Sequence, residues 1–189
     1  DKYGVGYPEQ LKEIAETIVV CSKNGHLIGY ILLSDALKED ALNAVKSLRE
    51  LKIRNIQILS GDKQALVDTV VRRLKADKGY GDLLPEGKVE HITRIKYHQE
   101  KVKGQSGKRT VAFVGDGIND APALAEADVG LAIGTGTDVA IESADVVLMS
   151  GNLQGVANAI ALSKATIGNI HQNLFWAFIY NLIGIPIAA

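Results

Sequence analysis

The chain has 189 residues, of which 47% are hydrophobic and 23% are charged, and its formal net charge is −1. This length and composition predict one globular domain with a sizeable core and exclude an intrinsically disordered chain. Because the charge is nearly balanced and no basic stretch dominates, we expect no nucleic-acid partner.

Hydrophobic periodicity predicts strands that alternate with helices along most of the chain. Residues 17–22 and 26–33 are expected to form a hairpin, because Lys23-Asn24-Gly25 places an Asn-Gly turn signal between two apolar runs. Further strands are predicted at 55–59, 82–84, 110–114, 129–133 and 146–149. Helices are predicted at 35–51, 64–74, 88–97, 119–126, 137–143 and from about 153 onward, with a loop at 101–109. This alternation predicts an α/β fold in which a parallel sheet carries helices on both faces.

The two ends of the sequence differ in character. The chain begins at Asp1 with no signal peptide, and its single cysteine, Cys21, excludes an internal disulfide and a paired-cysteine metal site. We expect Cys21 in the core of a cytosolic domain. Residues 174–189 carry no charge, and Asn181 is their one strongly polar side chain. As a helix they would span about 24 Å against the roughly 30 Å of a bilayer core, so we expect a truncated transmembrane helix.

An acidic, glycine-rich segment follows the predicted strand 110–114. Gly115-Asp116-Gly117-Ile118-Asn119-Asp120 places two carboxylates four residues apart, and its glycines permit a sharp turn and close approach of a ligand. Carboxylates at the end of a strand are typical ligands of Mg²⁺, which prefers oxygen donors. Asp116 and Asp120 are therefore candidate magnesium ligands. The alternative is a tight turn and a helix N-cap formed by Asn119 or Asp120.

Two other segments carry groups that can hold a phosphate. Ser60-Gly61-Asp62 follows a predicted strand and precedes a helix, where a hydroxyl and backbone N–H groups favour anions, although a plain N-cap is an alternative. Lys88 lies near the start of a predicted helix, where a cation opposes the helix dipole. It is either a phosphate-binding point charge or a solvated surface lysine. His91 and His98 are expected at the surface of the same region.

These segments together resemble the signature motifs of heavy-metal-transporting P-type ATPases. Ser60 replaces the Thr of a Thr-Gly-Asp motif, and Gly87 takes the third place of a Pro-Glu-Asp-Lys motif. The similarity spans about residues 18–189, and its motifs lie at 59–62, 85–88, 115–124 and 134–140. The resemblance implies a haloacid-dehalogenase-like fold with a Rossmann-like parallel sheet, ATP and Mg²⁺ as cofactors, and an aspartyl-phosphate.

The resemblance also implies roles for the residues at the matching positions. Asp116 would ligate Mg²⁺, and Asn119 and Asp120 would complete or orient that site. The other implied roles concern the phosphoryl group. Ser60, Gly61 and Asp62 would hold it and position the hydrolytic water. Lys88 would neutralise the aspartyl-phosphate.

One part of the family pattern is missing. The family's nucleophile is the Asp of an Asp-Lys-Thr-Gly-Thr motif, whereas Asp1-Lys2 is followed by Tyr3-Gly4-Val5. In the family the nucleophile lies upstream of an inserted nucleotide-binding domain. We therefore expect residues 1–33 to be the tail of that insert and the return strand, 34–151 the phosphorylation domain, and 152–189 a stalk and truncated transmembrane helix. The isolated chain should not phosphorylate itself.

The transported ion is indicated by the uncharged end of the chain. Tyr180-Asn181 resembles the copper(I)-transporting members, whereas zinc- and cadmium-type members usually have a lysine in this helix. The resemblance implies that Tyr180 and Asn181 help to bind Cu⁺ in the membrane. The alternative is an inter-helix hydrogen bond and an interfacial tyrosine.

The partners implied by the resemblance are the membrane and the nucleotide-binding, actuator and transmembrane domains of the same polypeptide. Three other functions stay open. They are a zinc- or cadmium-type P-type ATPase, a soluble haloacid-dehalogenase-like phosphatase, and a membrane-tethered module that binds Mg²⁺ or phosphate without catalysis.

Overall fold

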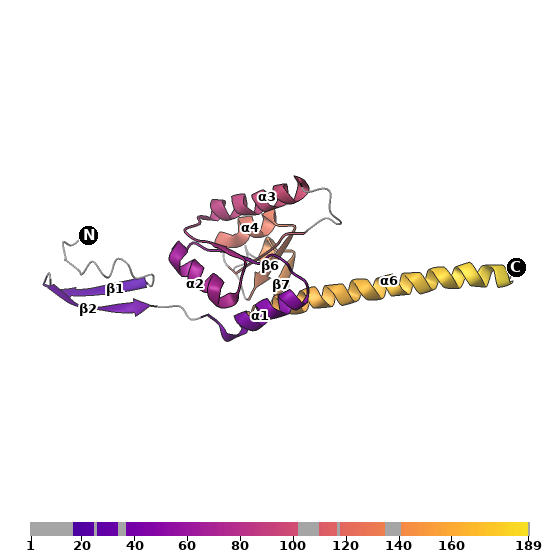
Figure 1. Ribbon diagram of the computed structural model, residues 1–189, viewed down its shortest axis with the longest axis horizontal. Helices are drawn as coiled ribbons and strands as arrows, with labels where there is room; N and C mark the ends of the chain where they lie inside the picture. The colour runs from indigo at the N-terminus through magenta and orange to yellow at the C-terminus, as the bar shows by residue number, and fades with distance from the viewer. Residues whose placement is uncertain are drawn as a thin grey trace.

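The computed structural model describes residues 17–24, 26–33, 37–101, 110–116, 118–134 and 141–188. The first described element is an antiparallel hairpin of β1 (Thr17–Lys23) and β2 (His26–Leu33), shown in Figure 1. Asn24 has a φ of 51°, as a tight turn between two strands requires, so the predicted hairpin is confirmed. Cys21 on β1 is exposed, and its expected place in the core is wrong.

The remaining strands are parallel and form two separate sheets. The first consists of β3 (Gln57–Leu59) and β4 (Lys78–Tyr80). The second has the order β5-β6-β7 and consists of β5 (Ala112–Gly115), β6 (Val129–Ile133) and β7 (Val146–Leu148). The α/β fold with parallel strands is confirmed, but within the described residues the sheet is divided between β3 and β5.

Helices follow the strands as the periodicity predicts. They are α1 (Glu39–Glu50), α2 (Gln64–Leu74), α3 (Pro85–Lys101), a 3₁₀ turn η2 (Ile118–Asp120), α4 (Ala121–Glu126) and α6 (Gln154–Ala188). The predicted helix 64–74 is confirmed at both ends, whereas α3 begins at Pro85, earlier than expected. Most of the predicted loop 101–109 and helix 137–143 lies outside the described residues.

The strand predicted at 82–84 is wrong, and the strand lies earlier, at Lys78–Tyr80. Asp82 has a φ of 54°, which is incompatible with an extended strand. The Asp82 N–H donates to the Asp62 carbonyl and the Leu83 N–H to the Ser60 carbonyl, so this segment closes a loop against the end of β3.

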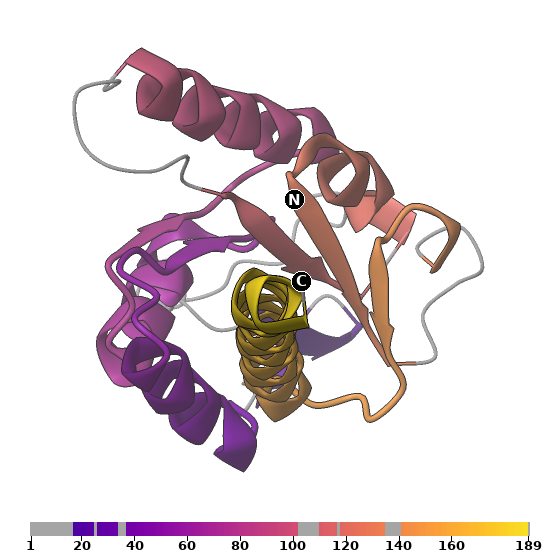
Figure 2. The same cartoon turned by 90° about the vertical axis from the view of Figure 1, so that its right-hand side faces the viewer.

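Helices cover both faces of the second sheet (Figure 2). Successive residues of a strand point to opposite faces, and the middle of β6 follows this rule. Leu131 packs with Leu48 of α1 and with the start of α6. Ala132 packs on the other face with Leu124 of α4. The two contacts confirm the predicted layers.

An aspartate precedes β4, β6 and β7 and accepts a backbone N–H at the start of the neighbouring segment. The bonds run from Ile56 N to Asp77 Oδ2 at 2.6 Å, from Val111 N to Asp128 Oδ2 at 2.8 Å, and from Gly130 N to Asp145 Oδ2 at 2.8 Å. The same carboxylate geometry therefore holds the starts of adjacent strands together in both sheets. At each place the carboxylate accepts a backbone N–H that the hydrogen bonds between the strands leave unpaired.

Helix α6 begins against α1 and then leaves the body of the molecule (Figure 1). The Leu153 N–H donates to Asp40 Oδ2 at 3.0 Å, and Gln154 Nε2 donates to Ser47 Oγ at 3.3 Å. Most large apolar side chains of the far part, between Leu174 and Ile187, are exposed. No helix within the described residues is long and apolar enough to cross a membrane.

A candidate phosphoryl-transfer site

The centre of the candidate site is an ion pair between two parts of the chain that are distant in sequence. Lys88 Nζ on the first turn of α3 lies 2.6 Å from Asp120 Oδ1 on η2. The two side chains are only 15% and 14% exposed. A lysine and a carboxylate that share a partly desolvated place interact more strongly than a surface pair. Lys88 is therefore a largely buried, paired lysine and not a solvated surface lysine.

The end of β5 is shaped to receive the Asp120 carboxylate. A Cβ atom added to Gly115 would lie 2.7 Å from Asp120 Cβ and 2.8 Å from Asp120 Oδ2. Position 115 therefore requires glycine, because any side chain would displace the carboxylate. Asp116, the next residue, is exposed beside this cradle, and Asn119 is exposed on η2. The strand end thus brings the Asp120 carboxylate against Gly115, and Asp116 follows directly in the chain.

These oxygen donors fit a magnesium ion. Mg²⁺ keeps several waters and is usually bound by one or two carboxylates together with phosphate oxygens of the substrate. Asp116 and the second oxygen of Asp120 can provide such a partial ligand set. Within the described residues no group of three histidine, cysteine or acidic side chains is placed to hold a metal by itself. The donors present therefore suit an ion that binds together with a phosphate.

The Ser60-Gly61-Asp62 loop follows β3 and is held by its own hydrogen bonds. Ser60 Oγ donates to Asp62 Oδ2 at 2.8 Å, and the Asp62 N–H donates to Ser60 Oγ at 3.2 Å. The Ser60 N–H donates to the Tyr80 carbonyl at 2.9 Å. Among the described residues the Gly61 N–H has no partner, so it is the backbone donor of this loop that can reach an anion.

One backbone donor at the start of α2, where the sequence predicts a phosphate-binding loop, is already paired within the protein. Asp82 Oδ2 accepts the Gln64 N–H at 3.1 Å, so a carboxylate of the protein already occupies that helix N-terminus. Asp82 was not singled out from the sequence, because it fell at the start of the strand predicted at 82–84. Among these donors the Gln64 N–H is occupied by Asp82, whereas the Gly61 N–H stays available to an anion.

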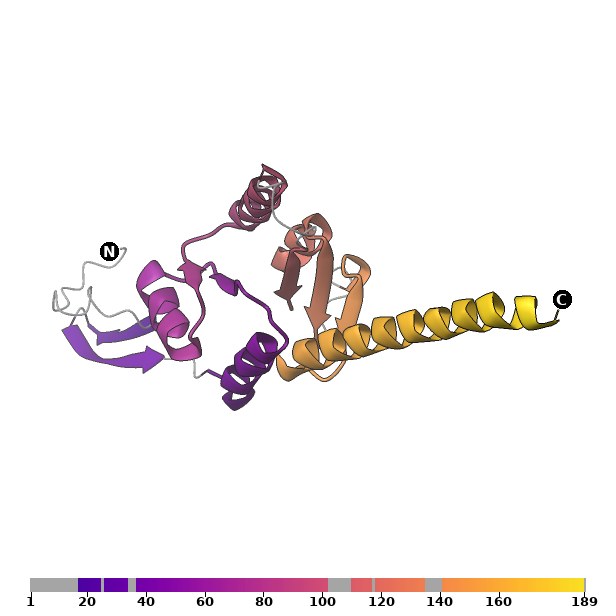
Figure 3. The same ribbon diagram turned by 45° about the vertical axis from the view of Figure 1, so that its right-hand side comes forward.

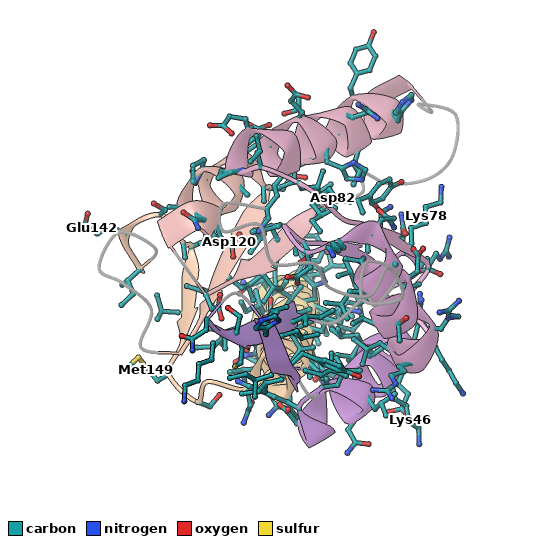
Figure 4. The ribbon with its side chains drawn as sticks, turned by 90° about the vertical axis from the view of Figure 1, so that its left-hand side faces the viewer. Lys46, Lys78, Asp82, Asp120, Glu142 and Met149 are labelled. Carbon is teal, nitrogen blue, oxygen red and sulfur yellow. The ribbon has the colours of Figure 1, made fainter. Side chains whose placement is uncertain are left out.

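A continuous chain of contacts connects the two loops. The segment after β4 bonds to the Ser60 loop through Asp82 and Leu83, and it leads directly into α3, which carries Lys88 to Asp120. Figure 4 labels Asp82 and Asp120, which both lie beneath α3 in that view. Within the described residues no hydrogen bond or ion pair joins the Asp62 side chain to Lys88 or Asp120. The structure thus brings Lys88 and Asp120 into contact and links the Ser60 loop to them through backbone.

His91 is buried, so its expected place at the surface is wrong. It lies on α3, shares a hydrogen bond with Gln57 of β3 and stacks its ring near Tyr80 of β4. The pKa of His91 is lowered by burial first, and then by the positive charges of Arg94 and Lys78. The sequence offers one signal, the spacing of three residues from Lys88, which places the two side chains on one face of a helix.

Tyr180 and Asn181 lie apart from this site. Both are exposed on the far part of α6, which Figure 1 shows extending away from the sheets. Their predicted role in binding a transported ion stays a prediction.

Residues 2–128 match the haloacid dehalogenase-like hydrolase family. The chain is 55% identical over 165 residues to copper-transporting ATPase 2 of Rhizobium meliloti (strain 1021), which covers 87% of this chain and 19% of that protein. It is 46% identical over 181 residues to the silver exporting P-type ATPase of Salmonella typhimurium, with 96% and 21% covered.

A solved structure of similar fold is the zinc-transporting PIB-type ATPase in the E2.Pi state. It superposes with a TM-score of 0.74 at 35% identity, over 93% of this chain and 28% of that chain. The chain spans about a fifth of the length of the two ATPases described above. The match over residues 2–128, together with the parallel α/β fold, shows that this chain belongs to the haloacid dehalogenase-like hydrolase family, with copper-transporting and silver-exporting P-type ATPases among its relatives.

Proposed function

We propose that this chain is part of a P-type ATPase that couples ATP hydrolysis, through an aspartyl-phosphate, to the transport of Cu⁺ across a membrane. The observation that carries the proposal is the partly buried pair of Lys88 and Asp120 beside the Gly115 cradle. Phosphoryl transfer depends mainly on positioning and on neutralising charge in a place with little water. The copper- and silver-transporting relatives support this reaction over that of a soluble phosphatase.

The acidic turn and the lysine would act together on the phosphoryl group. Asp116, Asn119 and Asp120 would hold Mg²⁺, which when bound neutralises charge on the phosphoryl oxygens. Lys88 is paired with Asp120 before the reaction, so its ammonium group is already in place when the phosphoryl group enters. Lys88 then donates to a phosphoryl oxygen, and the shared carboxylate keeps the lysine from moving away.

The Ser60 loop would serve the opposite side of the phosphoryl group. The Gly61 N–H, which follows the carboxyl end of β3, would donate to one of its oxygens. The Ser60 hydroxyl donates to Asp62 Oδ2 before the phosphoryl group enters and would then turn to donate to a second phosphoryl oxygen. Asp62 accepts a hydrogen bond from the hydrolytic water and orients it. The hydrogen bond between Ser60 and Asp62 already fixes the two side chains relative to each other.

Two unpaired strand edges support the proposal that another segment of the same polypeptide completes this site. Among the described strands, β3 pairs with β4 alone and β5 pairs with β6 alone. Figure 3 shows β3 on the side of its sheet that faces β5. A parallel strand between these edges would join the sheets and end beside Ser60 and Asp116, because parallel strands end at the same sheet edge. We infer that this strand carries the nucleophilic aspartate, since the sequence contains no Asp-Lys-Thr-Gly-Thr motif.

The rest of the chain has matching proposed roles. Residues 1–33 belong to the tail of a nucleotide-binding insert, 34–151 form the phosphorylation domain in the cytosol, and 152–189 form a stalk that enters the membrane. The exposed apolar side chains at the end of α6 support membrane entry, because a water-exposed surface of this kind needs a cover. Tyr180, which is 78% exposed, and Asn181 would contribute to a Cu⁺ site with helices of the other domains.

The proposal is tested in the full-length protein in membrane vesicles. Asp116→Ala should abolish Cu⁺-stimulated ATP hydrolysis and formation of an acid-stable, hydroxylamine-labile phosphoprotein, because the magnesium ligand set is lost. Asp68→Ala, an exposed carboxylate on α2, is the matched control and should leave both unchanged. Turnover that survives Asp116→Ala would disprove the magnesium role. Stimulation by Zn²⁺ or Cd²⁺ in place of Cu⁺ would disprove the proposed ion.

A further inference from the structure

His91 is the buried polar side chain of the described region, and its partners come from both strands of the first sheet. It is 8% exposed, and its Nε2 lies 3.0 Å from Gln57 Oε1 on β3. Its ring centroid lies 4.0 Å from that of Tyr80 on β4, at an interplanar angle of 51°. Because the Gln57 carbonyl oxygen can only accept, the Nε2 proton of His91 is the donor.

The same contacts connect His91 to the candidate site on two sides. On α3, Lys88 precedes His91 by three residues, so the two share one helix face. On the sheet, the Tyr80 carbonyl accepts the Ser60 N–H, and Gln57 lies three residues before Ser60. His91 therefore contacts each strand that holds the Ser60 loop and sits one turn from the lysine.

The place occupied by His91 suits the neutral imidazole. The charged and titratable groups around it are Arg94 on its own helix and Lys78 and Tyr80 on β4, while β3 contributes the neutral Gln57. Within the described residues Nδ1 has no hydrogen-bond partner. A second proton would therefore place an unpaired N–H donor and a charge next to two cations in a buried place.

We propose that His91 is a positioning residue, which docks the Lys88 helix on β3 and β4 and so holds the lysine at Asp120 beside the Ser60 loop. This inference rests on the proposed function of Lys88 in phosphoryl transfer. It adds that the neutral imidazole at position 91 maintains the geometry, so that protonation of His91 loosens the contact between Lys88 and Asp120.

The test measures hydrogen exchange of the Lys88 ammonium group by NMR in the full 189-residue chain, labelled with ¹⁵N-lysine in detergent micelles. Lys88→Arg assigns the signal. His91→Phe keeps a ring on Tyr80 but leaves Gln57 Oε1 without its donor, so Lys88 should exchange about tenfold faster, as expected when one buried hydrogen bond is lost. His98→Phe, an exposed histidine on the same helix, is the control and should change nothing.

A second variant separates positioning from a general loss of folding. His91→Phe with Gln57→Leu removes both polar groups, and the apolar pair should restore slow exchange of Lys88. Because burial lowers the pKa of His91, the pH must be taken from 7 to below the usual histidine range. This should speed exchange in the wild type but not in the double variant. This direction is diagnostic, because exchange of an unperturbed ammonium group slows in acid.

Two outcomes would overturn the inference, and they differ in what else they affect. Slow exchange of Lys88 in both the wild type and His91→Phe would disprove the role of His91 and leave the proposed function intact. Rapid exchange of Lys88 in the wild type would show that Lys88 does not pair with Asp120. Both proposals depend on that pair, so both would fail.

Discussion

The two sheets of the molecule share one type of hydrogen bond, from a backbone N–H to an aspartate, and differ in the contacts that surround it. In each, an aspartate before a strand accepts an N–H at the start of its neighbour. Around β6 this hydrogen bond is embedded in apolar packing, with Leu131 and Ala132 buried between helices. Around β3 and β4 it is joined by further polar contacts, from Arg49 to Asp77 and from Gln64 to Asp82.

The difference indicates how each half is stabilised. Apolar burial around β6 does not depend on protonation, whereas the contacts around β3 and β4 are directional and include carboxylates and a histidine. We therefore expect stability to change more with pH around β3 and β4, where the buried His91 lies, than around β6, where apolar packing dominates.

The largest expected effect tests the apolar half. Leu124 is 1% exposed and packs on Ala132, so Leu124→Ala should lower the free energy of unfolding by about 2–5 kcal/mol. Urea unfolding followed by circular dichroism measures this change. Leu162→Ala, at an exposed position on α6, should change it by less than about 0.5 kcal/mol. Equal effects of the two substitutions would show that α4 does not form the core of this half.

An intermediate effect is expected where the apolar half meets the site. Gly115→Ala puts a methyl group within 2.8 Å of Asp120 Oδ2, so it should cost about 1–3 kcal/mol and separate Asp120 from Lys88. Urea unfolding and the Lys88 ammonium signal report the two effects. Gly87→Ala is the control, because its added methyl group meets Leu83 at an ordinary 3.4 Å in a helix. An unchanged Lys88 signal in Gly115→Ala would contradict the inference that Gly115 makes room for the Asp120 carboxylate.

The smallest expected effect tests the polar half. Hydrogen bonds from the Ile56 N–H and from Arg49 hold the pKa of Asp77 below its usual 3.8. The carboxylate therefore stabilises the fold above that pH, and its contribution is lost as the pH falls through the lowered pKa. Asp77→Asn should cost about 0.5–1 kcal/mol at pH 7, since its ion pair with Arg49 is partly exposed to solvent, and this cost should shrink in acid.

Asp145→Asn is the matched control in the other sheet. Its amide oxygen can still accept the Gly130 N–H, and no lysine or arginine pairs with Asp145 among the described residues. The cost at pH 7 should be smaller. If Asp145→Asn lowered the free energy of unfolding as much as Asp77→Asn, the ion pair between Arg49 and Asp77 would not account for the difference between the two sheets.

Much of this fold follows from local patterns. The Asn-Gly turn specifies the hairpin, and the periodicity of residues 64–74 and 129–133 predicts α2 and β6 at their observed bounds. The short strand β4 was missed because Lys78-Gly79-Tyr80 lacks an apolar run, and its partner β3 determines its place. The false strand at 82–84 shows the same limit, since hydrogen bonds to the β3 loop determine its conformation.

The sequence by itself determined the class of fold, the candidate residues of both loops and the resemblance that names their roles, because these depend on residue type and spacing along the chain. The tertiary structure alone decided that Lys88 meets Asp120, that Gly115 makes room for that carboxylate, that Asp82 closes the start of α2, and that His91 is buried. The physical reason is that burial and close contact are properties of pairs. They arise between segments that lie tens of residues apart, and no local pattern records which partner each side chain will meet.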